Sequence, residues 1–235
     1  MSKREDIIDP AAAEKVRYGL VYTERCGWID LGHASPQGEH GATAFWTRLK
    51  NTQTDGDAGQ RPRDSAQGGR PSISGRASSV AYSQMMGNRM VKVGIQKRYE
   101  IQPGLTEDEL RGVALAIFQD VSLRFEGLQA SWVFSWKTDS GFSAEDLVSD
   151  LISFYRAVLP GKSYVAMCEP VSKDEALKIW DEFGAVGSMK NRSFDPILFA
   201  RDEKTGRRKQ QVGKLPPFLD SIKPIAPGKL YRVLP

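Results

Sequence analysis

TEDELRGVALAIFQDVSLRFEGLQ, residues 106–129, is the stretch that decides the fold, because it carries the complete pattern of one long helix. Thr106 followed three residues later by Glu109 has the spacing of a capping box, which starts a helix. From there apolar side chains recur at intervals of three and four residues, the period of one helix face. That face comprises Leu110, Ile117, Val121, Phe125 and Leu128. The sequence therefore predicts a helix from Thr106 to about Leu128.

A polar stripe follows the far edge of that apolar face and includes Ser122, Glu126 and Gln129. Leu115 and Leu123 interrupt the side of the helix that would otherwise face water, which suggests that something covers this side too. In that arrangement Glu126 is partly buried, and burial raises the pKa of a carboxyl group toward the range of a general acid or base. The alternative interpretation is an ordinary solvated helix flank.

Outward from this helix, the chain alternates short helices and strands. Further helices are expected at 11–16, 41–50, 143–160 and 172–184. Strands are expected at 18–23, 80–86, 90–101, 163–168, 196–200 and 230–233. Gly87-Asn88 is a two-residue hairpin turn between two of them. The sequence predicts an α+β fold, a single domain over residues 1–235 with several helices packed on a small, mostly antiparallel sheet.

Residues 51–79 differ sharply in composition from their surroundings. They are rich in Gly, Ser, Arg, Gln and Asp, with one Ile and no aromatic residue. Such a segment cannot bury enough apolar surface to fold. We expect a disordered loop inserted into the domain, because neither flank alone makes a complete domain.

The composition of the 235-residue chain, 40% apolar and 26% charged, is that of a soluble globular protein and excludes a fibrous one. No run approaches the ~20 apolar residues of a membrane helix. The opening MSKREDIIDP lacks the apolar core of a secretory signal, so we expect synthesis in the cytoplasm without a signal peptide. Two cysteines without a CxxC spacing argue against a thiolate zinc site, and a multi-histidine metal site is limited to His33 and His40 plus carboxylates, although one disulfide stays open.

The segment CGWIDLGH, residues 26–33, is a candidate site. On a helix, Asp30 and His33 would share a face, and a carboxylate beside an imidazole fixes its tautomer. The alternative is that the apolar residues of this segment fill the core and His33 caps a helix. Cys26 is either a nucleophile with His33 as its base or a small buried apolar residue.

A third candidate is TDSGFSAEDL, residues 138–147. Ser143 and Asp146 have a spacing that a helix cap explains. Asp139 and Ser140, in the preceding loop, are not explained in this way and are candidate site residues.

Taken together, these motifs resemble an uncharacterised bacterial family, a domain of unknown function, over about residues 18–160. Its members share an aromatic-Ile-Asp…His element and a Phe-Ser-Pro-Glu-Asp…Ser-Asn element. In this chain Ala144 stands in place of the proline and Asp150 in place of the asparagine. The family supplies no established reaction. The chain is also similar to effectors that bacteria deliver by contact-dependent secretion, which implies a toxin that a dedicated secretion system exports.

The first functional hypothesis is an antibacterial hydrolase acting on a cell-envelope polymer, peptidoglycan. In it His33, oriented by Asp30, works with Glu126 in acid–base chemistry or holds a single metal ion with it. The expected partners are the polymer and a cognate immunity or delivery protein. The sequence identifies no cofactor.

The alternative is a non-enzymatic protein that binds a polyanion or a protein partner through its basic ends. The candidate anion-binding residues are Arg207, Arg208 and Lys209. Neither this turn nor the 51–79 segment holds the aromatic residues that stack on bases, which argues against nucleic acid. A third possibility is an adaptor that docks through the acidic middle of the chain, although most of those acids lie at predicted helix starts.

Overall fold

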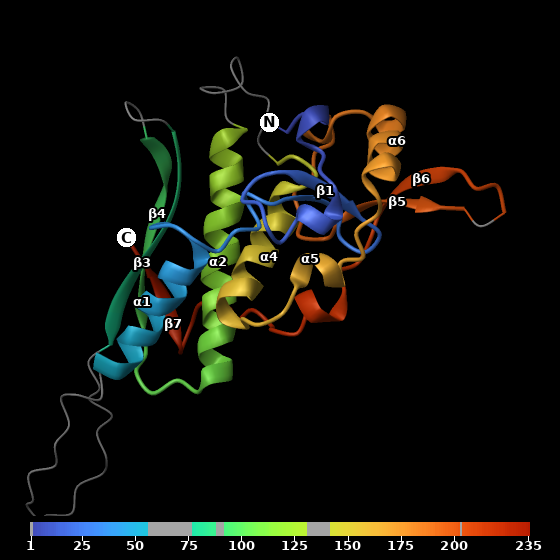
Figure 1. Ribbon diagram of the computed structural model, residues 1–235. Helices are drawn as coiled ribbons and strands as arrows, with labels where there is room; N and C mark the ends of the chain where they lie inside the picture. The colour runs from blue at the N-terminus through green and yellow to red at the C-terminus, as the bar shows by residue number, and fades with distance from the viewer. Residues whose placement is uncertain (1, 56–76, 88–91, 131–141, 203) are drawn as a thin grey trace, which may run out of the picture.

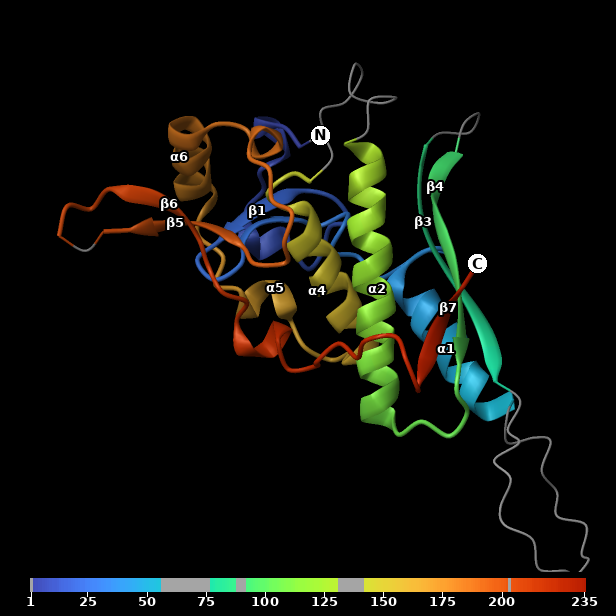
Figure 2. The ribbon, with the colours of Figure 1, turned by 180° about the vertical axis from the view of Figure 1, so that it is seen from behind.

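A long central helix organises the molecule. The computed structural model describes residues 2–55, 77–87, 92–130, 142–202 and 204–235. Helix α2 (Glu107–Gln129) runs between a three-stranded sheet with α1 on one side and the remaining helices and hairpins on the other (Figures 1 and 2). The other helices are α1 (Ala42–Asp55), α4 (Asp146–Val158), α5 (Tyr164–Met167) and α6 (Lys173–Phe183). The strands are β1 (Leu20–Thr23), β2 (Gly27–Asp30), β3 (Ser78–Gly87), β4 (Lys92–Ile101), β5 (Ile197–Arg201), β6 (Arg208–Val212) and β7 (Tyr231–Leu234).

Helix α2 begins with the capping box that the sequence predicts. The Thr106 hydroxyl accepts a hydrogen bond from the Glu109 backbone N–H at 3.3 Å, and the Glu109 carboxylate accepts one from the Thr106 N–H at 2.9 Å. The two residues therefore satisfy donors that the first turn of a helix leaves free. The helix ends at Gln129, one residue beyond the expected end.

Aromatic side chains pack against α2 from two sides. Phe118 lies 5.7 Å from the ring of Tyr82 on β3 and 5.2 Å from Phe154 on α4, measured between ring centroids. Phe45 of α1 continues the row at 4.3 Å from Tyr82. Leu115, on the face that would otherwise meet water, is 2% exposed. The second covering layer suggested by Leu115 is confirmed, whereas Leu123 stays at the surface.

The α+β fold is confirmed, with the described strands divided among three small antiparallel sheets. The sheets are β1-β2, β3-β4-β7 and β5-β6. In the largest, Val80 of β3 faces Tyr99 of β4, and Tyr99 in turn faces Val233 of β7. The last strand of the chain thus closes the sheet that covers α2.

The segment before β7 crosses α2 at Gly112. The Ile225 N–H donates to the Gly112 carbonyl at 3.1 Å, and a Cβ at position 112 would lie 2.8 Å from the carbonyl oxygen of Lys223. Only glycine permits this close crossing without a shift of the backbone.

Residues 163–168, expected to form a strand, instead contain the short helix α5, and that prediction is wrong. The Cys168 N–H donates to the Tyr164 carbonyl at 3.1 Å. Tyr164, Val165 and Cys168 are all buried. A short run that is apolar on every side has no period, so the sequence cannot separate a strand from a helical turn there.

Several expected boundaries also change. Helix α1 continues to Asp55 and β3 begins at Ser78, so the predicted loop at 51–79 is too long at both ends; residues 56–76 lie outside the described part of the chain. The predicted helix at 11–16 is a 3-10 turn, Pro10–Ala12, that the Asp9 carboxylate caps. Strand β6 was not predicted.

None of the helices in the described ranges combines the length and the apolar character needed to cross a membrane.

The packing of α2 predicts a large effect for one core truncation. Phe118→Ala removes a ring that packs against Tyr82 on one side of α2 and Phe154 on the other, so the free energy of unfolding should fall by about 3–5 kcal/mol. Leu123→Ala, on the exposed side of the same helix, should cost less than about 1 kcal/mol. Urea unfolding of both variants checks this, and equal losses would contradict the assignment of α2 as the centre of the core.

Candidate functional site

The β1-β2 hairpin ends in a turn that the Asp30 carboxylate holds. Its Oδ1 accepts hydrogen bonds from the backbone N–H groups of Gly32 at 2.6 Å and His33 at 3.2 Å. Asp30 is the last residue of a strand, so the expectation that it shares a helix face with His33 is wrong. The expectation that it orients the imidazole is also wrong, because its Oδ1 binds the backbone of the turn and its Oδ2 faces the Ser2 hydroxyl. Asp30 positions the loop that carries His33.

The imidazole of His33 is held by a carboxylate on α4, far from it in the sequence. Its Nδ1 lies 3.3 Å from Oδ1 of Asp150 on α4. The second oxygen of Asp150 accepts a hydrogen bond from Nε2 of Gln84 on β3 at 3.2 Å, and the same Gln84 nitrogen donates to the Ser122 hydroxyl at 3.0 Å. Side chains from β3, α2 and α4 thus fix the carboxylate, and the carboxylate fixes the ring.

Helix α4 also anchors the hairpin end through its buried serine. The Asp30 N–H donates to Oγ of Ser149 at 2.9 Å, and Ser149 is fully buried. The Ser2 hydroxyl lies within 3.4 Å of Oδ2 of Asp30 and 3.1 Å of Oε1 of Glu145. The turn before His33 is therefore tied to the start and the middle of α4.

Glu126 is completely buried behind the His33–Asp150 pair, so it does not lie on a solvated helix flank. Its Oε2 accepts a hydrogen bond from the Phe142 N–H at 2.8 Å, while Oε1 receives none. Burial, together with the nearby carboxylates of Asp146 and Asp150, raises the pKa of Glu126 to about 9. Glu126 is thus a neutral acid at pH 7, and its proton can be shared with the Asp146 carboxylate beside it.

The surrounding acids show the same effect of burial and crowding. Burial and the neighbouring Asp146 raise the pKa of Glu145 to about 7, and burial raises that of Asp146. Burial alone would lower the pKa of His33. The Asp150 carboxylate, helped by Asp146 and Asp30, outweighs it and raises that pKa well above 6.5. Asp150 therefore favours the protonated ring, whose Nδ1–H donates to the carboxylate.

The capping-box spacing of Ser143 and Asp146 is borne out in its acid half, because Oδ2 of Asp146 accepts the Ser143 backbone N–H at 2.9 Å. Helix α4 itself begins at Asp146, later than expected, so this bond holds the turn before the helix.

A cavity of about 350 Å³ opens beside the pair. Its wall includes His33, Asp150, Gln84, Phe125 and His40. The His33 side chain is 36% exposed, whereas that of Asp150 is 9% exposed. The imidazole therefore reaches the cavity while its carboxylate partner is shielded, and Nε2 is the ring nitrogen left without the Asp150 bond.

His40, which the sequence did not single out, lines the same cavity. Its Nδ1 lies 2.9 Å from the Ser83 hydroxyl on β3. The loop after Asp30 thus brings both histidines of the chain to one cavity.

Other predicted site residues lie apart from this cavity. Cys26 is 1% exposed at the turn between β1 and β2, so the whole length of β2 separates it from His33. Its partner in the core is the buried Cys168. Gln129 is half-buried at the end of α2, and no contact within the described ranges joins it to His33. Asp139 and Ser140 lie outside the described residues.

One of the three expected anion-binding residues, Arg208, forms ion pairs inside the fold. Nη2 of Arg208 lies 2.8 Å from Glu24 and 3.1 Å from Glu175, and the Arg208 side chain is 6% exposed. Arg208 therefore joins β6 to the β1-β2 hairpin and α6 instead of presenting charge to solvent. Arg207 and Lys209 are exposed.

The site can move protons. An imidazolium with a buried carboxylate partner is an arrangement that serves as a general acid and, after losing its proton, as a general base. Within the described residues, no group of three or more His, Cys, Asp or Glu side chains is placed to hold a metal ion.

Comparison of the chain with protein-family models, with curated proteins and with solved structures finds no match. The chemistry of the site therefore has to be argued from its own geometry.

The buried acids predict a specific dependence of stability on pH. The folded protein holds protons on Glu126 and Glu145 that the unfolded chain releases near pH 4.3, so stability should fall as pH rises toward about 9. The raised pKa of His33 acts in the same direction, because its contribution is lost as pH rises through that pKa.

Glu126→Gln should remove much of this loss, because the amide keeps an acceptor for the Phe142 N–H and cannot ionise. We expect the variant to match the wild type at pH 5 and to exceed it by about 1–3 kcal/mol at pH 9. Thermal unfolding across this range is the measurement, with the exposed Glu182→Gln as the matched control. Parallel curves for all three proteins would show that Glu126 is already ionised in the fold.

Proposed function

We propose that this protein is a hydrolase whose reacting centre is the cavity beside His33. The observation that carries the proposal is the His33–Asp150 pair, in which the ring faces the cavity and the carboxylate behind it is shielded and fixed. Burying a carboxylate and a cation together is costly, and a protein that only needed stability would gain as much from apolar side chains. Perturbed titratable groups at the wall of a cavity favour a functional role.

The raised pKa of His33 assigns the order of the proton transfers. The imidazolium, stabilised by Asp150, gives the proton on Nε2 to the leaving atom of the bond that breaks. The neutral ring then takes a proton from the attacking water, which supplies the hydroxide for the other fragment and restores the imidazolium. One water is consumed and the enzyme returns to its starting state.

Glu126 has a positioning role in this proposal. It does not line the cavity, and it binds the backbone of Phe142 and crowds Asp146. As a neutral acid it adds no negative charge beside Asp150 and Asp146.

We further propose a bacterial cell-envelope polymer, peptidoglycan, as the substrate, and an antibacterial effector as the role. The resemblance to effectors delivered by contact-dependent secretion supports this choice. A partner that neutralises the toxin or delivers it belongs to the same proposal.

Expression in two compartments of a bacterium tests the substrate class. The wild type should lyse cells when directed to the periplasm and leave growth unchanged when kept in the cytoplasm, because the polymer lies only outside the inner membrane. His33→Ala should abolish lysis at equal expression. Growth arrest from the cytoplasm, or lysis by the variant, would contradict the proposal.

The role of Asp150 is tested by substitution. Asp150→Asn removes the charge that stabilises the imidazolium, so release of soluble fragments from purified cell walls should slow by about 10²–10⁴-fold. Asp181→Asn, at an exposed ion pair with Arg4, is the matched control and should retain activity.

The pH profile separates catalysis from a merely structural effect. Activity should fall as pH rises through the pKa of His33, because the ring must carry the proton that it gives away. In Asp150→Asn the residual activity should fall at a lower pH than in the wild type. A profile that does not move would assign the acid to another group.

A further inference from the structure

A second cavity, of about 300 Å³, lies on the other side of the loop that carries His33. Its wall includes Arg17, which precedes β1, and Arg156, on the last turn of α4. Ser35 and Gln37 line both this cavity and the cavity beside His33, so the two adjoin along one stretch of loop. A ligand seated at His33 could therefore extend into it.

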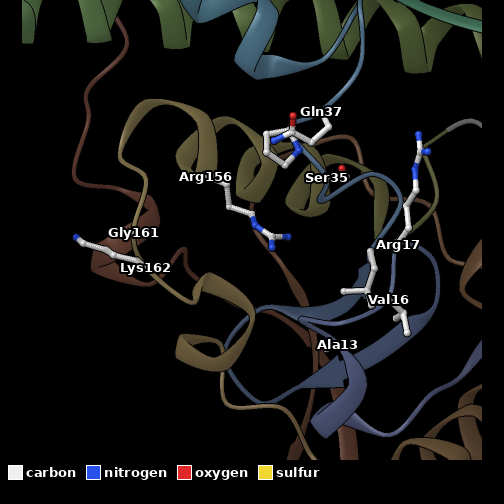
Figure 3. Close-up of a pocket in the computed structure, with 10 residues that line it drawn as sticks. Ala13, Val16, Arg17, Ser35, Gln37, Arg156, Gly161 and Lys162 are labelled. Carbon is white, nitrogen blue, oxygen red and sulfur yellow. The ribbon is translucent and has the colours of Figure 1, made fainter.

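Among the residues that the structure describes, the wall of this cavity carries positively charged side chains and no carboxylate. Arg156 reaches into it from α4, with Arg17 across the cavity (Figure 3). Within the described ranges Arg17 forms no ion pair, and its guanidinium lies over the ring of Tyr18. Glu14 is the acid at hand, and it lies 3.1 Å from Arg156 and 2.8 Å from the Ser163 hydroxyl.

Arg156 is well placed to recognise a ligand because the fold already restricts its side chain. Its Nη1 donates to the Ala34 carbonyl at 3.3 Å, and its side chain is 26% exposed. A guanidinium held in place loses little freedom when it binds an anion, and its planar donors match the oxygens of carboxylate and phosphate groups. The Ser35 hydroxyl and the Gln37 amide add neutral polar groups at the boundary with the His33 cavity.

We propose that this cavity binds an oxyanion group of the substrate, a carboxylate or a phosphate, and so holds an anionic segment of the polymer next to His33. The inference rests on the proposed function for the identity of the polymer, but the binding of the anion stands on Arg17 and Arg156 alone. A polymer with charged groups at intervals along its chain fits two adjoining cavities, one for the bond that breaks and one for the charge.

NMR titration of the full chain tests the cavity without any measurement of activity. The probes are acetyl-Ala-Ala with a free carboxylate, the same peptide as its amide, and inorganic phosphate. We expect the free acid to shift the signals of Arg17 and Arg156, the amide to leave them unchanged, and the affinity to fall as salt is added. Tighter binding of phosphate than of the peptide would identify the group as a phosphate, and the reverse order as a carboxylate.

The main variant is Arg17→Gln, because Arg17 is exposed and its loss should leave the fold intact. Its affinity for the bound probe should fall about tenfold, which corresponds to about 1.4 kcal/mol. Arg192→Gln, an exposed arginine whose guanidinium lies over the ring of Phe142 as that of Arg17 lies over Tyr18, is the matched control and should bind as the wild type does. Arg156→Gln should show at least the same loss, with thermal unfolding measured alongside because Arg156 also holds Glu14 and Ala34.

Failure of either proposal can be told apart from failure of the other. If no probe binds, or if Arg17→Gln binds as tightly as the wild type, the oxyanion cavity is wrong even where periplasmic lysis depends on His33. If the probes bind as expected but lysis does not occur, the cavity stands and the hydrolase proposal fails.

Discussion

The burial of α2 on both sides is the constraint on which the rest of the structure depends. A helix at the surface buries one face, but Phe118 packs between Tyr82 and Phe154, from elements on opposite sides. The segment before β7 must then cross the helix at Gly112 so that β7 reaches its sheet. Because layers pack against α2 from two sides, Ser122 and Glu126 enter the interior with the apolar residues, while Leu123 and Arg124 stay exposed. The core thus creates the polar site by burying groups that would otherwise be hydrated.

Burial then determines the charge states around His33. Several carboxyl groups lie buried close together, and they cannot all be ionised at once, because each charge raises the free energy of the next. The proton stays on Glu126, whose pKa rises to about 9, while Asp150 is paired with the imidazolium. The imidazolium of His33, surrounded by these acids, holds its proton more strongly than a free histidine does. The same crowding that costs stability therefore gives His33 the properties of a general acid.

The loop after Asp30 connects the two cavities, and its conformation is fixed from both ends. Asp30 holds the backbone of the turn, and Ser149 holds Asp30. Farther along, Arg156 binds the Ala34 carbonyl, and Ser83 binds His40. Helix α4 thus supplies the partner of His33, the support of the turn and a charged wall of the second cavity. A site built from one loop on such a frame can hold its geometry without a ligand.

The sequence by itself determined the local structure: the capping box at Thr106, the length of α2, the α+β class, and the polar stripe that brings Glu126 to the site. These follow from spacings of three and four residues, which a linear pattern contains. It could not determine that residues 163–168 turn into a helix, because an apolar run has no period. Nor could it show that His33 pairs with Asp150, 117 residues away, instead of the nearby Asp30. Asp150 lies on a polar stripe of α4 with Asp146, Ser149 and Ser153, and such a stripe in a sequence does not reveal that all four side chains are buried. Partners of this kind are chosen by the packing of α4 against the hairpin, and only the tertiary structure decides that contact.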